Sequence, residues 1–205
     1  MTRFSIKIEN ILGLSYYRYE LTSSTYNPQI DTAFTVTVKV TDIFGNNVSG
    51  KAVNLYHDGT SVSTQNTLSD GTYTWTITPS TWGLHDFRVQ NQSIQVNVTG
   101  WREITEYRVT QNNTPTIQAY TNGEYVRIRF KAHTISSVGT NWVVINETNN
   151  KMPSQYCPPY GDLTSYMIYA KTEVALWSNG QLSIRVFDGN TRAVTMRGDI
   201  VYPIS

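Results

Sequence analysis

A strict alternation of apolar and polar residues is the feature that most restricts the fold of this chain. In residues 34–41, phenylalanine or valine occupies one set of alternate positions, and threonine or lysine occupies the other. The same period of two returns in residues 73–77, 94–98, 126–132 and 182–186. Because neighbouring side chains of a strand point to opposite faces, these segments are predicted to be half-buried β-strands.

Turn residues separate the predicted strands of the first half. Asp42–Asn47, Asp58-Gly59 and Ser69–Gly71 are rich in Gly, Asn and Asp, which tolerate the backbone angles of tight turns. Strands at this spacing over residues 30–98 predict a two-sheet β-sandwich. The aromatic stretch Tyr16–Leu21 is either an opening strand or a stalk.

We place a domain boundary at Thr99-Gly100-Trp101, which gives domains of residues 1–99 and 100–205. The second domain contains seven or eight short alternating segments, a number that suits a jelly roll or a compact sandwich. The chain as a whole is therefore expected to be all-β.

A proline-rich stretch, Met152–Tyr160, interrupts the strands of the second domain. Pro153, Pro158 and Pro159 fix φ and lack backbone donors, so this stretch is predicted to be neither helix nor central strand. We expect a stiff, extended crossing between two sheets. Cys157, the only cysteine, has no neighbouring basic residue that would lower its pKa, which favours a structural thiol over a nucleophile.

Composition excludes several classes of function. Only 15% of residues are charged, against about 25% in ordinary domains, and the basic residues of a chain with net charge +1 are scattered. This argues against a nucleic-acid partner, and the absence of any run of 18 apolar residues argues against membrane insertion. The opening residues lack the apolar core of a signal peptide, so we expect either a virion component or a fragment.

The histidines give no sign of a metal site or a catalytic dyad. His57, His85 and His133 are far apart in the sequence and lack metal-ligand spacing. His57-Asp58 and His85-Asp86 are sequence neighbours, which point to opposite faces of a strand. We therefore predict no metal and no cofactor.

Carboxylates give no clear catalytic pair either. A glycosidase requires two carboxyl groups held across a cleft. Glu103, Glu106, Asp162 and Glu173 are available, but no pattern brings two of them together. We predict no catalytic residues and a non-enzymatic protein.

A basic stripe occupies alternate positions of one predicted strand, at Arg127, Arg129 and Lys131. A solvated or subunit-facing strand explains it, and an anion site is the alternative.

The order of motifs in residues 30–98 resembles that of bacterial Ig-like (Big-type) domains. The matching segments are Val36–Asp42, Phe44–Gly50, Val53–Leu55, Ser69–Tyr73 and Trp82–His85. This resemblance implies an Ig-like sandwich that serves as a spacer or an adhesive module.

Residues 140–205 resemble the C-terminal head of tailed-phage fibre and receptor-binding proteins. The matching segments are Met152–Pro159, Ala175–Ile184 and Gly198–Ile204, and Cys157 departs from the basic residue usual in that family. The resemblance implies a homotrimer on the virion that binds host cell-surface polysaccharide or protein and contacts other virion proteins.

Together these features predict a virion attachment protein, a fibre or a tail-associated receptor-binding protein. A secreted or cell-surface adhesin or carbohydrate-binding module, and a capsid decoration fibre, are the alternatives. The candidate ligand-binding residues are aromatic, amide or charged side chains in predicted turns: Trp177, Asn179, Asp188, Asn190 and Arg192. A role as an ordinary turn residue is the alternative for each of them.

Overall fold

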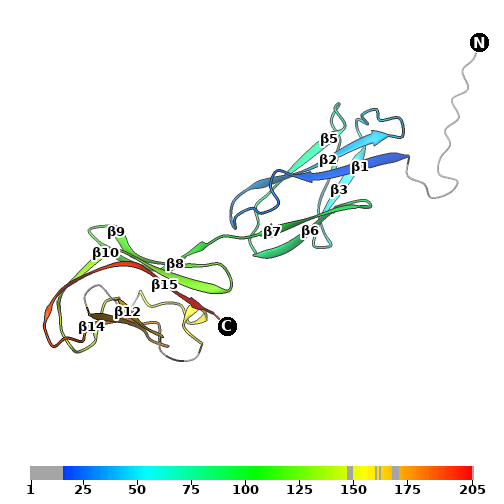
Figure 1. The fold of residues 1–205 in the computed structure, drawn as a ribbon. Coiled ribbons are helices and arrows are strands. Elements are labelled where there is room, and N and C mark those ends of the chain that lie inside the picture. Colours follow the sequence, from blue (N-terminus) through cyan, green and yellow to red (C-terminus); the bar gives the residue numbers. More distant parts are fainter. Residues whose placement is uncertain (1–15, 147–149, 160, 162, 168–170, 205) are drawn as a thin grey trace, which may run out of the picture. The chain divides into compact units, whose positions relative to one another are not determined.

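The computed structural model describes residues 16–146, 150–159, 161, 163–167 and 171–204 (Figure 1). The first 15 residues and Tyr160, the end of the proline-rich stretch, lie outside the described residues. The described chain consists of antiparallel strands and a single 3-10 turn, which confirms the all-β prediction. In these ranges no helix is long and apolar enough to cross a membrane.

The chain divides into two compact units, one ending at Gly100 and the other beginning at Trp101. The division lies one residue beyond the predicted boundary.

The first unit is a sandwich of a three-stranded and a four-stranded sheet, with strand orders β1-β2-β5 and β4-β3-β6-β7. Tyr16–Leu21 contributes to a strand rather than a stalk. The strands are β1 (Tyr17–Ser23), β2 (Phe34–Asp42), β3 (Ala52–His57), β4 (Thr60–Asn66), β5 (Thr72–Ile77), β6 (Gly83–Val89) and β7 (Gln92–Val98).

The apolar residues that alternate with polar ones in β2 are buried, as the sequence predicts. Val36, Val38 and Val40 are fully buried and pack with side chains of β3 and β6, such as Leu55 and Phe87, in one core between the sheets. On the other face of β2, the Thr37 hydroxyl lies 2.8 Å from the Thr74 hydroxyl of the paired strand β5.

Gly71 is required where β5 begins beside β2. Its φ is +78°, and a Cβ at this position would lie 2.6 Å from the carbonyl oxygen of Val40. The Gly71 carbonyl accepts a hydrogen bond from the Val40 N–H at 2.8 Å. Only glycine combines this left-handed conformation with so close an approach.

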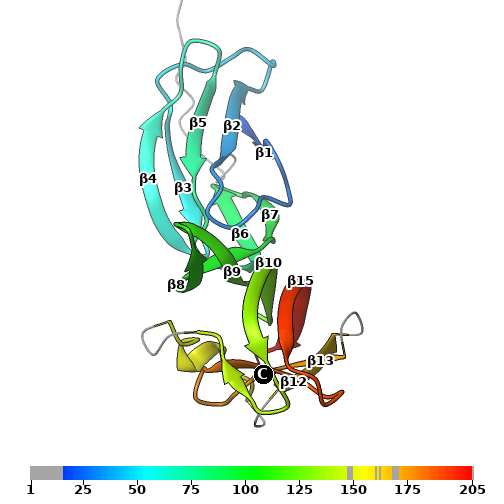
Figure 2. The same cartoon turned by 90° about the vertical axis from the view of Figure 1, so that its left-hand side faces the viewer.

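The second unit also consists of two sheets, with strand orders β15-β10-β9-β8 and β11-β14-β13-β12. Figure 2 shows β10 beside β15. The elements are β8 (Arg102–Gln111), β9 (Thr114–Thr121), β10 (Tyr125–Val138), β11 (Val143–Val144), η1 (Ser154–Tyr156), β12 (Leu163–Met167), β13 (Thr172–Leu176), β14 (Leu182–Val186) and β15 (Arg192–Pro203).

Both sheets of the second unit contribute to one core, so this unit is a sandwich as predicted. Ile117 and Ile128 enter the core from one sheet, and Leu182 and Ile184 enter it from the other. A jelly roll requires two Greek keys. Here β8, β9 and β10 instead form a meander, and β15 pairs with the last strand of that meander.

The proline-rich stretch is less extended than predicted. Ser154–Tyr156 forms the 3-10 turn η1, between extended residues at Pro153 and Cys157. Prolines fix φ only at their own positions, so the three residues between Pro153 and Cys157 can close a turn.

Cys157 is buried in the core of the second unit, and burial raises the pKa of its thiol. This environment agrees with a structural thiol. The hydroxyl of Tyr202 in β15 donates to the Tyr156 carbonyl at 2.6 Å, which joins the crossing to the last strand.

We expect Tyr202→Phe to reduce the stability of the second unit by about 1–2 kcal/mol, because it removes a donor from a part-buried carbonyl. Chemical unfolding measures this change. Tyr125→Phe, which alters an exposed tyrosine of the same sheet, is the control. Equal stability of the two variants would show that the hydrogen bond does not anchor the crossing.

Candidate functional site

The predicted ligand-binding residues lie at the two ends of β14. Trp177 and Asn179 precede the strand, whereas Asp188, Asn190 and Arg192 follow it. A strand of this length spans roughly 17 Å at about 3.3 Å per residue. The five residues therefore do not form one site.

The loop after β14 is held by its own side chains. The carboxylate of Asp188 accepts a hydrogen bond from the Arg192 guanidinium and another from the Asn190 N–H. The bond from Arg192 is the main reason why the pKa of Asp188 lies below its ordinary value. These contacts favour the ordinary-turn interpretation for all three residues.

Asn179 also stabilises a turn. Its Oδ1 accepts from the Gln181 N–H at 2.9 Å, and its Nδ2 donates to the Gln181 side chain at 3.0 Å. This contact places Asn179 in an Asx-type turn between β13 and β14.

Trp177 belongs to a group that we call the aromatic cluster: Trp142, Trp177, Arg185 and Glu173. The two indole rings meet edge to face with centroids 5.6 Å apart. The Arg185 guanidinium lies over the Trp142 ring at 4.4 Å and also donates to the Glu173 carboxylate. The Trp177 indole N–H donates to the Ser183 hydroxyl at 2.9 Å, which fixes the orientation of that ring.

Strand register assembles the aromatic cluster. Glu173 pairs directly with Arg185, while their neighbours Val174 and Ile184 enter the core. Since side chains alternate, the charged pair lies on the face of the sheet opposite to that core, where Arg185 is partly exposed and Glu173 is buried. The short β11 pairs with β14 and brings Trp142 to the same face.

Two of the four candidate carboxylates form ion pairs, and Glu106 is exposed on β8. Glu173 pairs with Arg185, and Glu103 accepts from Arg108 and from Gln118. Asp162 lies outside the described residues.

The basic stripe is largely neutralised by Asp199 of β15. Arg127 and Arg129 both donate to its carboxylate, and Arg129 is its direct register partner. Burial opposes ionisation of Asp199, but the hydrogen bonds from the two arginines hold its pKa below the ordinary value. This arrangement favours the structural interpretation over an anion site.

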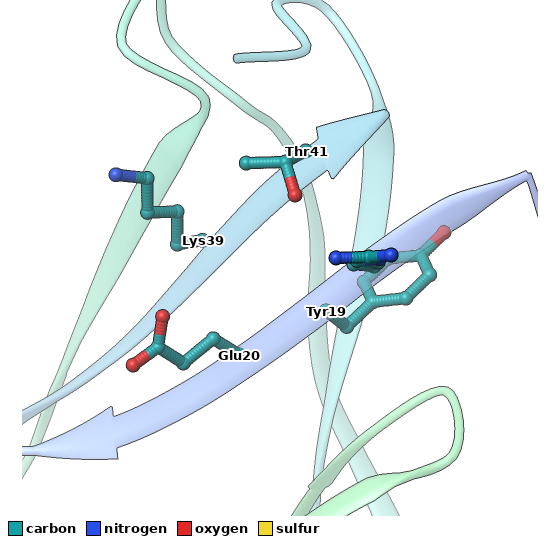
Figure 3. A pocket seen from close by; sticks show the side chains of 5 residues that line it. Tyr19, Glu20, Lys39 and Thr41 are labelled. Atoms are coloured by element: carbon teal, nitrogen blue, oxygen red, sulfur yellow. The ribbon is translucent and has the colours of Figure 1, made fainter. Parts of the chain in front are cut away.

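A depression of about 260 Å³ lies beside β1 and β2 (Figure 3). Glu20 and Lys39 are direct register partners there, and Arg18 faces Thr41. Opposite charges in this position are the usual stabilising pair of an antiparallel sheet. Strand pairing therefore accounts for the polar side chains that line the depression.

Two of the three histidines meet, which the sequence did not indicate. His57 ends β3 and His85 lies in the adjacent strand β6, with His57 Nε2 and His85 Nδ1 3.1 Å apart. The Asp58 carboxylate lies 2.7 Å from His85 Nδ1 and 3.4 Å from His57 Nε2. We call these three residues the histidine cluster.

The backbone and neighbouring side chains fix the histidine cluster. Asp58 has a positive φ of 49°, and its second carboxylate oxygen accepts from the Asp86 N–H at 2.8 Å. The His57 ring stacks on Phe87 with centroids 4.4 Å apart. His85 Nε2 lies 3.2 Å from the Thr81 carbonyl.

The surroundings of the histidine cluster favour the ionised form of Asp58 and disfavour the protonated form of His57. Burial lowers the pKa of His57, against the opposing effect of Asp58. Burial also opposes ionisation of Asp58, yet hydrogen bonds from His85 and Asp86 hold its pKa below the ordinary value.

His133 belongs to the second unit, in β10. Its Nδ1 lies 2.7 Å from the Thr116 hydroxyl, and burial lowers the pKa of its imidazole.

Because the folded pKa of His133 is lower than the unfolded value of about 6.5, the unfolded state binds more protons below that pH. The second unit should therefore lose stability as the pH falls through this value, until the folded pKa is reached. We expect His133→Asn to lose less stability than the wild type between about pH 7.5 and 5.5, as measured by chemical unfolding. An identical loss would contradict this assignment.

No family model and no curated protein matches the chain. Solved structures give weak likenesses to a putative membrane-anchored protein of Corynebacterium diphtheriae (7% identity, TM-score 0.34), the adhesin InvE of Yersinia pseudotuberculosis (14%, 0.34) and the α2-macroglobulin of E. coli (11%, 0.35). Each likeness covers at least 90% of this chain, but only 50%, 58% and 12% of the respective structures. These values do not place the chain in a family.

Proposed function

We propose that this chain is a non-enzymatic attachment protein of a virion, whose second unit binds host cell-surface polysaccharide or protein. The aromatic cluster is the observation that carries the proposal. It combines two half-buried tryptophans with a paired arginine and glutamate on the outer face of a sheet. Trp and Arg are the residues most enriched where binding energy concentrates at interfaces.

The cluster suits a ligand that presents both C–H faces and hydroxyl or amide groups. Indole rings offer apolar faces. The Arg185 side chain, which is 36% exposed, offers hydrogen-bond donors beside them, whereas the buried Glu173 carboxylate holds Arg185 in place. The bond from Trp177 to Ser183 orients one ring before any ligand arrives, which reduces the ordering cost of binding.

We further propose that the chain forms a homotrimer and that it contacts other virion proteins. Each described sheet ends in edge strands, a type of strand that is in general prone to uncontrolled association. A closed three-fold assembly covers such surface in a defined way.

Light scattering should give three times the 23.2 kDa mass of the chain. A monomer at micromolar concentration would contradict the trimer, and another oligomer would favour the adhesive or carbohydrate-binding module of a cell.

We expect Trp177→Ala to weaken binding to intact host cells at least about tenfold, the scale of an interface anchor. Binding is measured on a panel of bacterial cells, with and without competing wall polysaccharide. Tyr26→Ala, which removes an exposed aromatic side chain from the first unit, is the matched control.

Other outcomes of this cell-binding experiment would lead to different conclusions. Equal binding by both variants would exclude the aromatic cluster as the contact. Absence of binding to any cell would favour a capsid decoration fibre. Cleavage of the polysaccharide would contradict the non-enzymatic assignment.

A further inference from the structure

The histidine cluster lies in the first unit and is separate from the surface proposed for attachment. Its three ligand atoms, one each from His57, Asp58 and His85, lie within 4.8 Å of one another. We propose that it binds a divalent transition-metal ion of the zinc class.

The spacing of the ligand atoms fits such an ion. The three separations are 2.7, 3.1 and 3.4 Å. Tetrahedral zinc, with bonds of about 2.0–2.1 Å to nitrogen and oxygen, places its ligand atoms about 3.3 Å apart. Adjustments of up to about 0.6 Å, the largest of them between His85 and Asp58, therefore bring all three atoms to bonding distance of one ion.

The partners of His85 accommodate a cation at Nδ1. A bond from Nδ1 to Asp58, at 2.7 Å, requires a proton on Nδ1. A bond from Nε2 to the Thr81 carbonyl, at 3.2 Å, requires a proton on Nε2, whereas the Thr81 hydroxyl, at 3.4 Å, can donate to Nε2 without one. A neutral imidazole carries only one of these protons. With a metal ion on Nδ1, the ring donates its single proton to Thr81, and Asp58 meets a positive charge.

The surroundings of the cluster resemble the outer shell of a metal site. Metal-bound histidines usually donate their second N–H to a carbonyl or a carboxylate, as His85 is placed to do toward Thr81. The Asp86 N–H orients the Asp58 carboxylate, and Phe87 holds the His57 ring. The ligands are therefore positioned before an ion binds.

The ligand set determines the class of ion. Two imidazole nitrogens and one carboxylate oxygen suit zinc and its neighbours, whereas Mg²⁺ and Ca²⁺ prefer oxygen ligands alone. The side chain of His85 is 8% exposed, but those of His57 and Asp58 are 29% and 50% exposed. The exposed side leaves a fourth position for water or for a ligand of a partner.

A bound metal ion would connect three segments through its ligands. These are the end of β3 (His57), the β3–β4 turn (Asp58) and β6 (His85). An ion that binds only the folded protein stabilises it. The structure therefore assigns the site a stabilising role in the first unit.

The test uses the full chain without a histidine tag, after treatment with a chelator. Calorimetric titration should show one Zn²⁺ per chain, and Co²⁺ should give the visible absorption of a tetrahedral site. Zn²⁺ should raise the temperature at which the first unit unfolds, whereas equimolar Mg²⁺ should not.

Variants identify the ligands. We expect His57→Gln and His85→Gln to weaken Zn²⁺ binding by about 100-fold or more, and Asp58→Asn by at least about tenfold. His133→Asn, which removes the histidine of the second unit, should bind as the wild type does. Asparagine tolerates the positive φ of residue 58, so Asp58→Asn keeps the test valid if His85→Gln does not fold.

Two results would overturn the proposal. One is the absence of stoichiometric Zn²⁺ binding by the wild type, which would leave the histidine cluster as a group of hydrogen-bonded side chains. The other is wild-type affinity in folded His57→Gln and Asp58→Asn.

Discussion

The burial of alternate side chains between facing sheets is the interaction on which the rest of this molecule depends. In the first unit, Val36, Val38 and Val40 meet Leu55 and Phe87 across the sandwich. The second unit repeats the arrangement with its own residues. The one cysteine of the chain rules out an intrachain disulfide, so hydrophobic burial in each core, at about 25 cal/mol per Å², supplies the main stabilising force.

Both candidate sites depend on strand pairing, although they use it differently. The aromatic cluster occupies the outer face of a sheet whose inner face fills the core, so the register that buries Ile184 also exposes Arg185. The histidine cluster forms where β3 ends beside β6, and the turn at Asp58 brings a carboxylate to two imidazoles. The proposed attachment surface and the proposed metal site thus both depend on strand pairing, each within its own unit.

The sequence predicted individual strands well, because alternation is a local property. It did not predict partners that are distant along the chain. His57 and His85 are 28 residues apart, and their contact requires the pairing of β3 with β6. Trp142 joins the aromatic cluster only through the two-residue strand β11, which has too short a pattern to recognise. For the same reason the sequence left a jelly roll and a compact sandwich as alternatives for the second unit, since strand number does not determine strand order.

Hydrogen exchange of the full-length Leu55→Ala variant tests most directly whether each unit depends on its own core. Leu55 is fully buried in the first unit, and its truncation should cost about 2–5 kcal/mol. We predict that protection of amides in β2, β3 and β6 falls by this amount, while protection in β10, β13 and β14 is unchanged. An equal fall in both sets would contradict the account, because it would show that the two units unfold as one.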